Sequence, residues 1–249
     1  MDDLSDNRKF LKADWAELGR TNTDQKQRKP YPPLNKPYSE GAELISLPAV
    51  EQLSMGTMPL ATAIACRESR RKFSSHDITL DELAFLLWAT QGVRSVAPSG
   101  GAALRTVPSG GCRHTFETYL ACMRVADRVP GIYRYLPFEH KLLCEARMPD
   151  VGERAKLACL NQRMAGQSAV CFCWSTIPYR AEWRYATQAH KMIAIDAGHV
   201  CQNLYLACEA LGLGCCAIGA YDQQLADELI GVDGKDEFAV YLAAVGETA

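Results

Sequence analysis

The sequence has no excess of charge of either sign, because 27 Lys and Arg residues oppose 29 Asp and Glu residues among 249. Without a basic surplus or a basic cluster, electrostatics give no reason to expect a nucleic-acid partner. There is also no apolar run near the roughly 20 residues that cross a bilayer. Residues 1–5 are polar and acidic, unlike a signal peptide. These absences predict a cytoplasmic protein that binds neither nucleic acid nor membrane.

A disulfide framework is not indicated, although the chain has 11 cysteines. Their number is odd and none forms a C-x-x-C pair, so reduced thiols in a reducing compartment are expected. Cys171 and Cys173 share one face of an apolar strand, and Cys201 and Cys208 share one face of a helix, positions typical of small core residues. We therefore predict no metal site.

The composition predicts one globular domain with an appended arm. About half of the residues (48%) are apolar, enough for a large core. Residues 1–46 differ from the rest: one short helix near residues 10–18 is followed by a polar, proline-rich stretch at residues 21–33. We predict an extended arm over residues 1–46 and a domain over residues 47–249. The arm is either a mobile leader or a strap over a partner subunit, anchored by Trp15, Tyr31 and Tyr38.

The strongest periodic pattern lies in residues 192–211. Ile193, Ala197, Val200 and Leu204 recur at spacings of four and three, which indicates a core helix. Gly212 ends this helix, and a short strand follows at residues 215–218.

The other segments alternate between helical and strand patterns. Thr79 and Glu82 form a capping box that begins a helix near residue 80. Further helices are expected over residues 60–73, 150–164 and 222–230, a loop over 95–101, an antiparallel meander over 118–125, 131–136 and 140–144, and strands over 169–174 and 238–245. The sum is an α+β domain.

Two polar segments are candidates for binding an anion or a ligand. Residues 66–73 hold a dense group of cations with Ser69 among them, which is either a solvated helix end or a phosphate site. Pro108, Ser109, Gly110 and Gly111 form a loop that exposes backbone amides. Each pattern is weak when taken singly.

Taken in order, these segments resemble the nitroreductase superfamily, and most closely its SagB-type dehydrogenase branch. The resemblance covers about residues 57–247. It rests on motifs at residues 59–73, 86–93, 105–114, 131–135, 196–203 and 212–219.

The resemblance implies a central mixed, mostly antiparallel sheet flanked by helices, and a homodimer that binds FMN at the subunit interface. Arg67 and Ser69 would hold the phosphate and ribityl chain, Arg71 would face the pyrimidine edge, and residues 108–111 would come from the partner. The implied cofactor-binding residues are Arg67, Glu68, Ser69, Arg71, Pro108, Ser109, Gly110, Gly111, Arg113, Gln162, Ala217, Ile218, Gly219 and Ala220. A cation near the N1/O2 edge stabilises the anionic reduced flavin, and backbone amides near N5 orient hydride transfer.

The chain departs from the family pattern at two places. Many nitroreductases carry basic phosphate ligands in a tail beyond the last strand, which this sequence lacks, so Arg113 or Arg184 would take that role. Azoline-oxidising members have a Lys-Tyr pair before the long helix, where this chain has Arg184 and Tyr185. Arginine stays protonated and is a poor base, which argues against azoline oxidation.

The predicted function is that of an FMN-dependent oxidoreductase. Hydride would pass through flavin N5 to or from a small organic substrate, with NAD(P)H as one candidate donor and Tyr185 and Arg184 as the catalytic pair. The alternative is a non-catalytic flavin- or metal-binding redox sensor whose cysteines respond.

Overall fold

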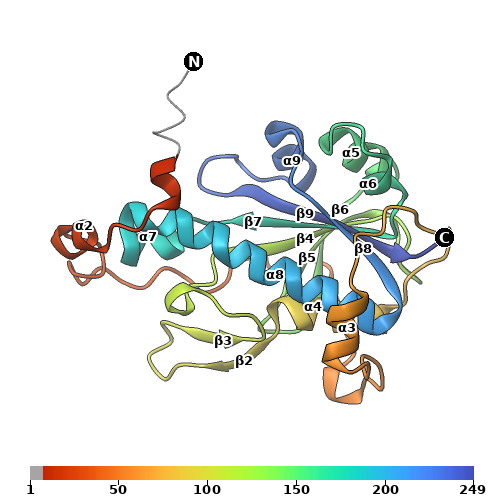
Figure 1. The fold of residues 1–249 in the computed structure, drawn as a ribbon, viewed down its shortest axis with the longest axis horizontal. Helices are drawn as coiled ribbons and strands as arrows, with labels where there is room; N and C mark the ends of the chain where they lie inside the picture. Colours follow the sequence, from red (N-terminus) through yellow and green to blue (C-terminus); the bar gives the residue numbers. More distant parts are fainter. Residues whose placement is uncertain (1–7) are drawn as a thin grey trace.

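The computed structural model describes residues 8–249, which fold around a seven-stranded sheet (Figure 1). The strand order is β1-β6-β5-β4-β7-β9-β8, and every neighbouring pair of these described strands is antiparallel. The strands are β1 (Leu44–Ser46), β4 (Phe116–Cys122), β5 (Gly131–Leu136), β6 (Lys141–Arg147), β7 (Val170–Thr176), β8 (Leu213–Ile218) and β9 (Phe238–Glu247). The predicted α+β architecture is confirmed.

The helices cover both faces of this sheet. They are α2 (Trp15–Arg20), α3 (Leu60–Cys66), α4 (Leu80–Gln91), α5 (Val151–Ala158), α6 (Arg163–Gln167), α7 (Tyr179–Tyr185), α8 (Ala189–Leu211) and α9 (Gln223–Ile230), with 3-10 turns at η1 (Arg8–Leu11), η2 (Val50–Gln52), η3 (Gly110–Cys112) and η4 (Ala186–Gln188). Side chains alternate along each strand, so β7 directs Phe172 and Trp174 into the core under α4 and α8. It directs Cys171 and Cys173 into the core under α5, α6 and α9.

Helix α8 is the long core helix that the sequence predicts, and Figure 1 shows it crossing the sheet. Ile193, Ala197, Val200 and Leu204 are buried along its inner stripe. Gly212 ends the helix in the left-handed region at φ +73°, where a side chain would be strained. The chain then reverses into β8, so the end of β8 returns along the helix.

The capping box also forms as predicted. The Glu82 amide donates to Thr79 Oγ1 at 3.2 Å, and the Thr79 amide donates to Glu82 Oε2 at 2.7 Å, which fixes the start of α4.

Two predicted helices are too long. The helix expected over residues 60–73 ends at Cys66, because the next residues become extended and contact the sheet edge: the Arg70 amide donates to the Cys215 carbonyl at 3.0 Å. The helix expected over residues 150–164 is divided into α5 and α6, since Leu160 and Asn161 adopt φ +54° and +63°. The expected loop at residues 95–101 lies within a hairpin of β2 (Val93–Val96) and β3 (Ala103–Arg105).

The described part of the arm lies along its own chain. Tyr31 stacks on Trp183 with ring centroids 5.0 Å apart, and the Gln25 amide donates to the Trp183 carbonyl at 2.9 Å. Arg134 donates from Nη1 and Nη2 to the carbonyls of Lys36 and Pro37 at 3.1 and 3.0 Å. The arm's last residues form β1, which pairs with β6. Residues 1–7 of the predicted arm lie outside the described part of the chain.

Within the described residues, no helix has the length and apolar character needed to cross a membrane. Over the same range, no three His, Cys, Asp or Glu side chains gather as a metal site. All 11 cysteines are free thiols, and eight of them are buried.

Candidate active site

The cationic segment after α3 lies against the second half of α8. The Arg67 guanidinium stands 5.3 Å from the centre of the Tyr205 ring, and Ser69 Oγ lies 2.8 Å from the Tyr205 hydroxyl. The same hydroxyl accepts the Ala217 amide at 2.8 Å. Tyr205 therefore joins the cationic segment to β8, and sequence reasoning did not single it out. The available signal was a tyrosine hydroxyl within a largely apolar core helix, which needs a hydrogen-bond partner when it is buried.

The charges of this segment are not equivalent. Arg70 forms a bidentate ion pair with buried Glu209, with N–O distances of 2.5 and 2.9 Å, and Glu68 lies 3.4 Å from the Arg70 Nε. Within residues 8–249, no carboxylate pairs with Arg67 or Arg71, and Arg71 is exposed. Two of the three arginines in this segment therefore remain for an anionic ligand.

The end of β8 forms the next part of the site. Gly219 and Ala220 are exposed, and Gln162 Nε2 donates to the Ala220 carbonyl at 2.8 Å. Cys216 lies near Arg71, but burial raises the pKa of its thiol, which therefore stays protonated. Residues 217–220 thus form a neutral strip beside two cations.

The glycine loop lies instead at the first half of α8. The Gly110 amide donates to Asp196 Oδ2 at 3.0 Å, and Ser109 Oγ accepts the His114 amide at 2.9 Å. Asp196 is buried, and burial raises the pKa of its carboxyl group. Pro108 and Gly111 stay exposed at the tip of the loop.

Arg184 and Tyr185 adjoin this loop. A Cβ at Gly111, where φ is +62°, would lie 2.3 Å from the Tyr185 hydroxyl and 3.2 Å from Arg184 Nη1. The Arg184 guanidinium lies 5.3 Å from the centre of the Tyr185 ring. Trp15 of the arm meets Tyr185 edge to face at 6.0 Å. The predicted catalytic pair therefore has the glycine loop on one side and the arm on the other.

Arg113 points into the protein rather than to the surface. Its Nε donates to the Arg180 carbonyl at 2.7 Å and its Nη1 to the Gly101 carbonyl at 2.8 Å. Burial lowers the pKa of this guanidinium. Arg184 is exposed, so the two arginines proposed for a phosphate have opposite environments.

The candidate residues thus form two groups on one chain. The first is Arg67, Ser69, Arg71 and the strip 217–220, with Tyr205; the second is the loop 108–111 with Arg184 and Tyr185. Asp196 and Tyr205 mark the groups on α8, and nine residues of helix separate them by about 14 Å along the axis.

An apolar cavity of about 510 Å³ opens between α8 and the ends of β7 and β9. Ile193, Ala197, Val240 and Tyr241 line it, with His190 and Gly219 also in the wall. Because Gly219 belongs to the strip 217–220, this cavity reaches the first group of candidate residues.

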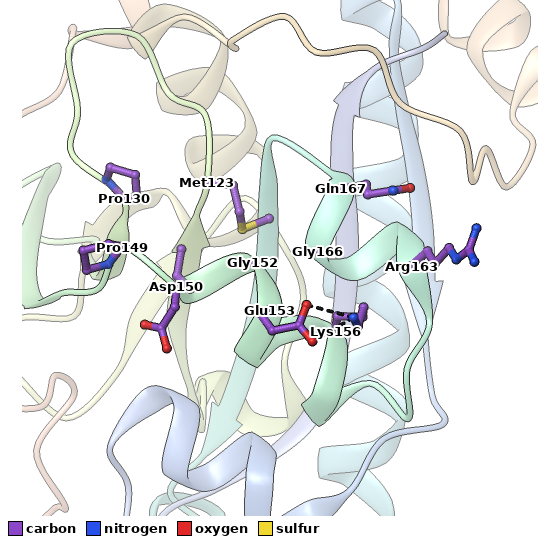
Figure 2. A pocket seen from close by; sticks show the side chains of 11 residues that line it. Met123, Pro130, Pro149, Asp150, Gly152, Glu153, Lys156, Arg163, Gly166 and Gln167 are labelled. Atoms are coloured by element: carbon purple, nitrogen blue, oxygen red, sulfur yellow. Dashed lines mark hydrogen bonds and ion pairs between the residues drawn. The ribbon is translucent and has the colours of Figure 1, made fainter.

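A second cavity, of about 480 Å³, lies at α5 and α6 (Figure 2), and none of the residues that line it is a predicted site residue. Three of its charged side chains are paired: Lys156 pairs with Glu153 at 2.7 Å and Asp150 with Arg154 at 2.9 Å. Gly152 and Gly166 bring the two helices together, since a Cβ at Gly166 would lie 2.3 Å from the Gly152 carbonyl oxygen. We regard this cavity as a by-product of close helix packing.

Comparison with known proteins gives one family and several related chains. The model of the nitroreductase family matches residues 64–247. A protein from Methanocaldococcus jannaschii whose name places it among the nitroreductases is 28% identical over 202 residues, which cover 81% of this chain and 95% of that one.

Three solved structures have a similar fold. A Ralstonia eutropha protein described as a nitroreductase is 26% identical, with a TM-score of 0.68 over 89% of this chain and 99% of that one. The Escherichia coli microcin synthetase McbBCD complex gives a TM-score of 0.63 at 17% identity over 90% of this chain and 80% of that one. The NADPH:FMN oxidoreductase of Vibrio harveyi, complexed with NAD+, gives 0.52 at 17% identity over 76% of this chain and 68% of that one. Because the family model spans most of the chain and both groups of candidate residues, the chain belongs to the nitroreductase family.

Proposed function

We propose that this protein is an FMN-dependent oxidoreductase of the SagB-type branch, acting as a homodimer in a reducing, cytoplasmic compartment. Membership of the nitroreductase family supports flavin-dependent oxidoreduction. The main support for FMN is that Arg67 and Arg71 pair with no carboxylate of residues 8–249 and lie beside Ser69 and the strip 217–220, whose end at Gly219 and Ala220 is exposed. The Vibrio harveyi structure of similar fold is named for FMN, and the microcin synthetase neighbour supports the branch.

The residues present fit a flavin mononucleotide. Arg67 and Ser69 supply one charged and one neutral donor for a phosphate or ribityl oxygen, held in place by Tyr205. Arg71 would face the pyrimidine edge, where a positive charge favours the anionic reduced ring. Gln162 uses one amide hydrogen to fix the Ala220 carbonyl, so it orients the strip and leaves its own oxygen available.

The glycine loop and the Arg184–Tyr185 pair would serve the flavin of the partner subunit. They stand about 14 Å along α8 from Tyr205, so a two-fold axis that crosses α8 would bring them against the partner's first group. Arg184 is exposed and pairs with no carboxylate among the described residues. We therefore assign contact with the phosphate of the partner's flavin to Arg184 rather than to Arg113. Bound flavin would supply hydride transfer at N5; the chain's own residues bind, orient and exclude water.

The test is the visible spectrum of the purified protein, with release of the chromophore by denaturation and anaerobic addition of NADH or NADPH. We expect a yellow protein that releases FMN, not FAD, and that bleaches with a pyridine nucleotide. If the bound FMN bleaches only with dithionite, NAD(P)H is excluded as the electron donor. A colourless protein that cannot be reconstituted with FMN would overturn the proposed function.

A further inference from the structure

The apolar cavity between α8 and β9 contains an imidazole that the proposed function does not use. His190 lies at the start of α8 and lines this cavity together with Gly219 of the strip 217–220. Neither Arg184 nor Tyr185 is among the described residues that line it. A substrate seated beside the flavin ring in this cavity would therefore meet His190 rather than Tyr185 of the same chain.

The imidazole is held by a carboxylate from another helix. His190 Nε2 lies 2.8 Å from Glu182 Oε1, which belongs to α7. A carboxylate only accepts at neutral pH, so Nε2 is the donor and Nδ1 is the nitrogen that can exchange a proton with a ligand. The His190 side chain is 53% exposed, so water can return a proton to it after each turnover. A base oriented by a carboxylate beside an apolar pocket is the arrangement that proton transfer requires.

The second titratable group of the cavity wall is less suited to this role. Tyr241 contacts Cys201, and burial raises the pKa of its hydroxyl to about 12. His190 supplies the imidazole of the wall, and imidazole is the side chain that most often serves as a general acid or base.

We propose that His190, oriented by Glu182, is the proton donor and acceptor for the substrate in this cavity, an inference that rests on the proposed flavin function. In substrate reduction, the imidazolium form of His190 would give its Nδ1 proton to the substrate oxygen, while bound flavin would supply the hydride to the electrophilic atom. In substrate oxidation, neutral Nδ1 would take the hydroxyl proton, while bound flavin would accept the hydride from carbon. Either direction moves one hydride and one proton, which together are two electrons and two protons, and solvent then restores the protonation state of the imidazole.

The first test measures binding without turnover. Apo protein is titrated with 4-nitrophenolate, a flat anion whose absorbance reports on hydrogen bonding to its oxygen. His190→Gln should bind about tenfold more weakly, the loss of one charge-assisted hydrogen bond. His199→Gln is the matched control, because His199 is an exposed histidine on the opposite side of α8. Equal binding by the His190 and His199 variants would overturn the inference.

The second test follows reoxidation of dithionite-reduced holoenzyme by duroquinone, whose methylated ring does not alkylate thiols. The quinone takes up hydride and one proton and leaves as the hydroquinone. His190→Gln should reoxidise about 100-fold more slowly and lose the solvent isotope effect. Glu182→Gln should be about tenfold slower, and His199→Gln should match the wild type.

These outcomes separate the inference from the proposed function. Wild-type protein that binds and reduces FMN, with a His190 variant that matches it in both measurements, would overturn the role of His190 alone. Wild-type protein that takes up no FMN would overturn the function itself.

Discussion

Arg71 is exposed, whereas its neighbours Arg67 and Arg70 are half-buried and contact Tyr205 and Glu209. Arg71 donates to the Ser69 carbonyl at 3.4 Å and lies beside the Cys216 thiol, and its exposed guanidinium is available to a ligand. Because the nearby Cys216 thiol stays neutral, the charge of Arg71 is not compensated locally.

Arg71→Ala should therefore weaken FMN binding about tenfold, as expected for one charge-assisted hydrogen bond, and make the flavin harder to reduce. Binding is measured by fluorescence titration of apo protein and the potential by reductive titration. Lys72→Ala is the control, because Lys72 is an exposed cation at the next position and should change neither quantity. Unchanged affinity and potential in Arg71→Ala would exclude Arg71 from the site.

Asp196 allows a prediction about pH. Its carboxylate is buried, and desolvation raises its pKa above the ordinary 3.8. The hydrogen bonds from Ser109 and Gly110 lower the pKa, but by less. A raised pKa of an acid means that the native state binds the proton more tightly, so this group's contribution to stability falls as pH rises through the raised pKa. At neutral pH, the free-energy cost of burying the Asp196 carboxylate is therefore fully present.

Asp196→Asn should therefore be more stable than wild type at pH 7, by about 1 kcal/mol, because the amide oxygen still accepts from Gly110. The advantage should shrink as the pH is lowered towards 4. Thermal unfolding across this range checks the expectation, with Asp81→Asn, an exposed residue of α4, as control. A variant less stable than wild type at pH 7 would mean that the hydrogen bonds outweigh desolvation.

At residue level, the sequence indicated most of the candidate groups but not how they meet. The cations near Ser69 and the glycine loop were readable because their residue types are unusual together. Tyr205 was not, since its role depends on contacts with Ser69 and Ala217, which are distant in sequence. The burial of Arg113 was equally invisible, because Gly101 and Arg180 supply its acceptors.

At the scale of elements, the arm is fixed to the sheet by buried charge. Lys36 Nζ pairs with Glu237 at 2.5 Å and donates to the Tyr119 hydroxyl at 2.8 Å. Glu237 is buried and also accepts from Ser175 Oγ at 2.6 Å. Removal of Lys36 alone would leave a buried carboxylate without its cation.

Lys36→Met should cost about 3 kcal/mol, the low end for breaking a buried pair, because 30% of the Lys36 side chain stays exposed. Lys36→Met with Glu237→Gln should recover most of that loss, since the glutamine can still accept from Ser175. Urea unfolding measures both. Lys29→Met, in the more exposed Lys29–Asp24 pair of the same arm, should cause no measurable change. Equal losses for the two lysines would show that the buried pair does not anchor the arm.

Elements defined by local signals were predicted well. The Thr79 capping box and the Gly212 cap each act within one turn, and α4 and α8 form as expected. The prediction that the helix continues after Cys66 was wrong because the structure of this segment is set by β8, almost 150 residues away. The Arg70 amide bonds to Cys215, and the Arg70 side chain pairs with Glu209. The break between α5 and α6 requires two consecutive residues with positive φ, Leu160 and Asn161, and leucine gives no warning of it.

At the scale of the whole molecule, the arrangement of the two groups predicts where a complete site lies. The first group contacts helix α8 at Tyr205, and the second group contacts the same helix at Asp196. Next to Asp196, α8 exposes Ile195, which keeps 49% of its surface accessible, and the small residues Ala194 and Gly198, which also line the apolar cavity. Small residues permit close approach of a second copy, so each site of the proposed dimer would combine the first group of one chain with the second group of the other.

Mixed dimers test this directly. One chain carries Arg67→Ala with Arg71→Ala, and the other carries Gly111→Trp, which fills the loop tip next to Tyr185. Neither homodimer should bind FMN. If sites are shared between chains, the mixed dimer has one site with both defects and one with none, so it should bind one FMN. If each site lies within one chain, both sites carry a defect and the mixed dimer should bind none. Absorbance of differently tagged, co-purified dimers gives the stoichiometry, and a value near zero, with wild-type dimers at two, would place the loop 108–111 in its own chain's site.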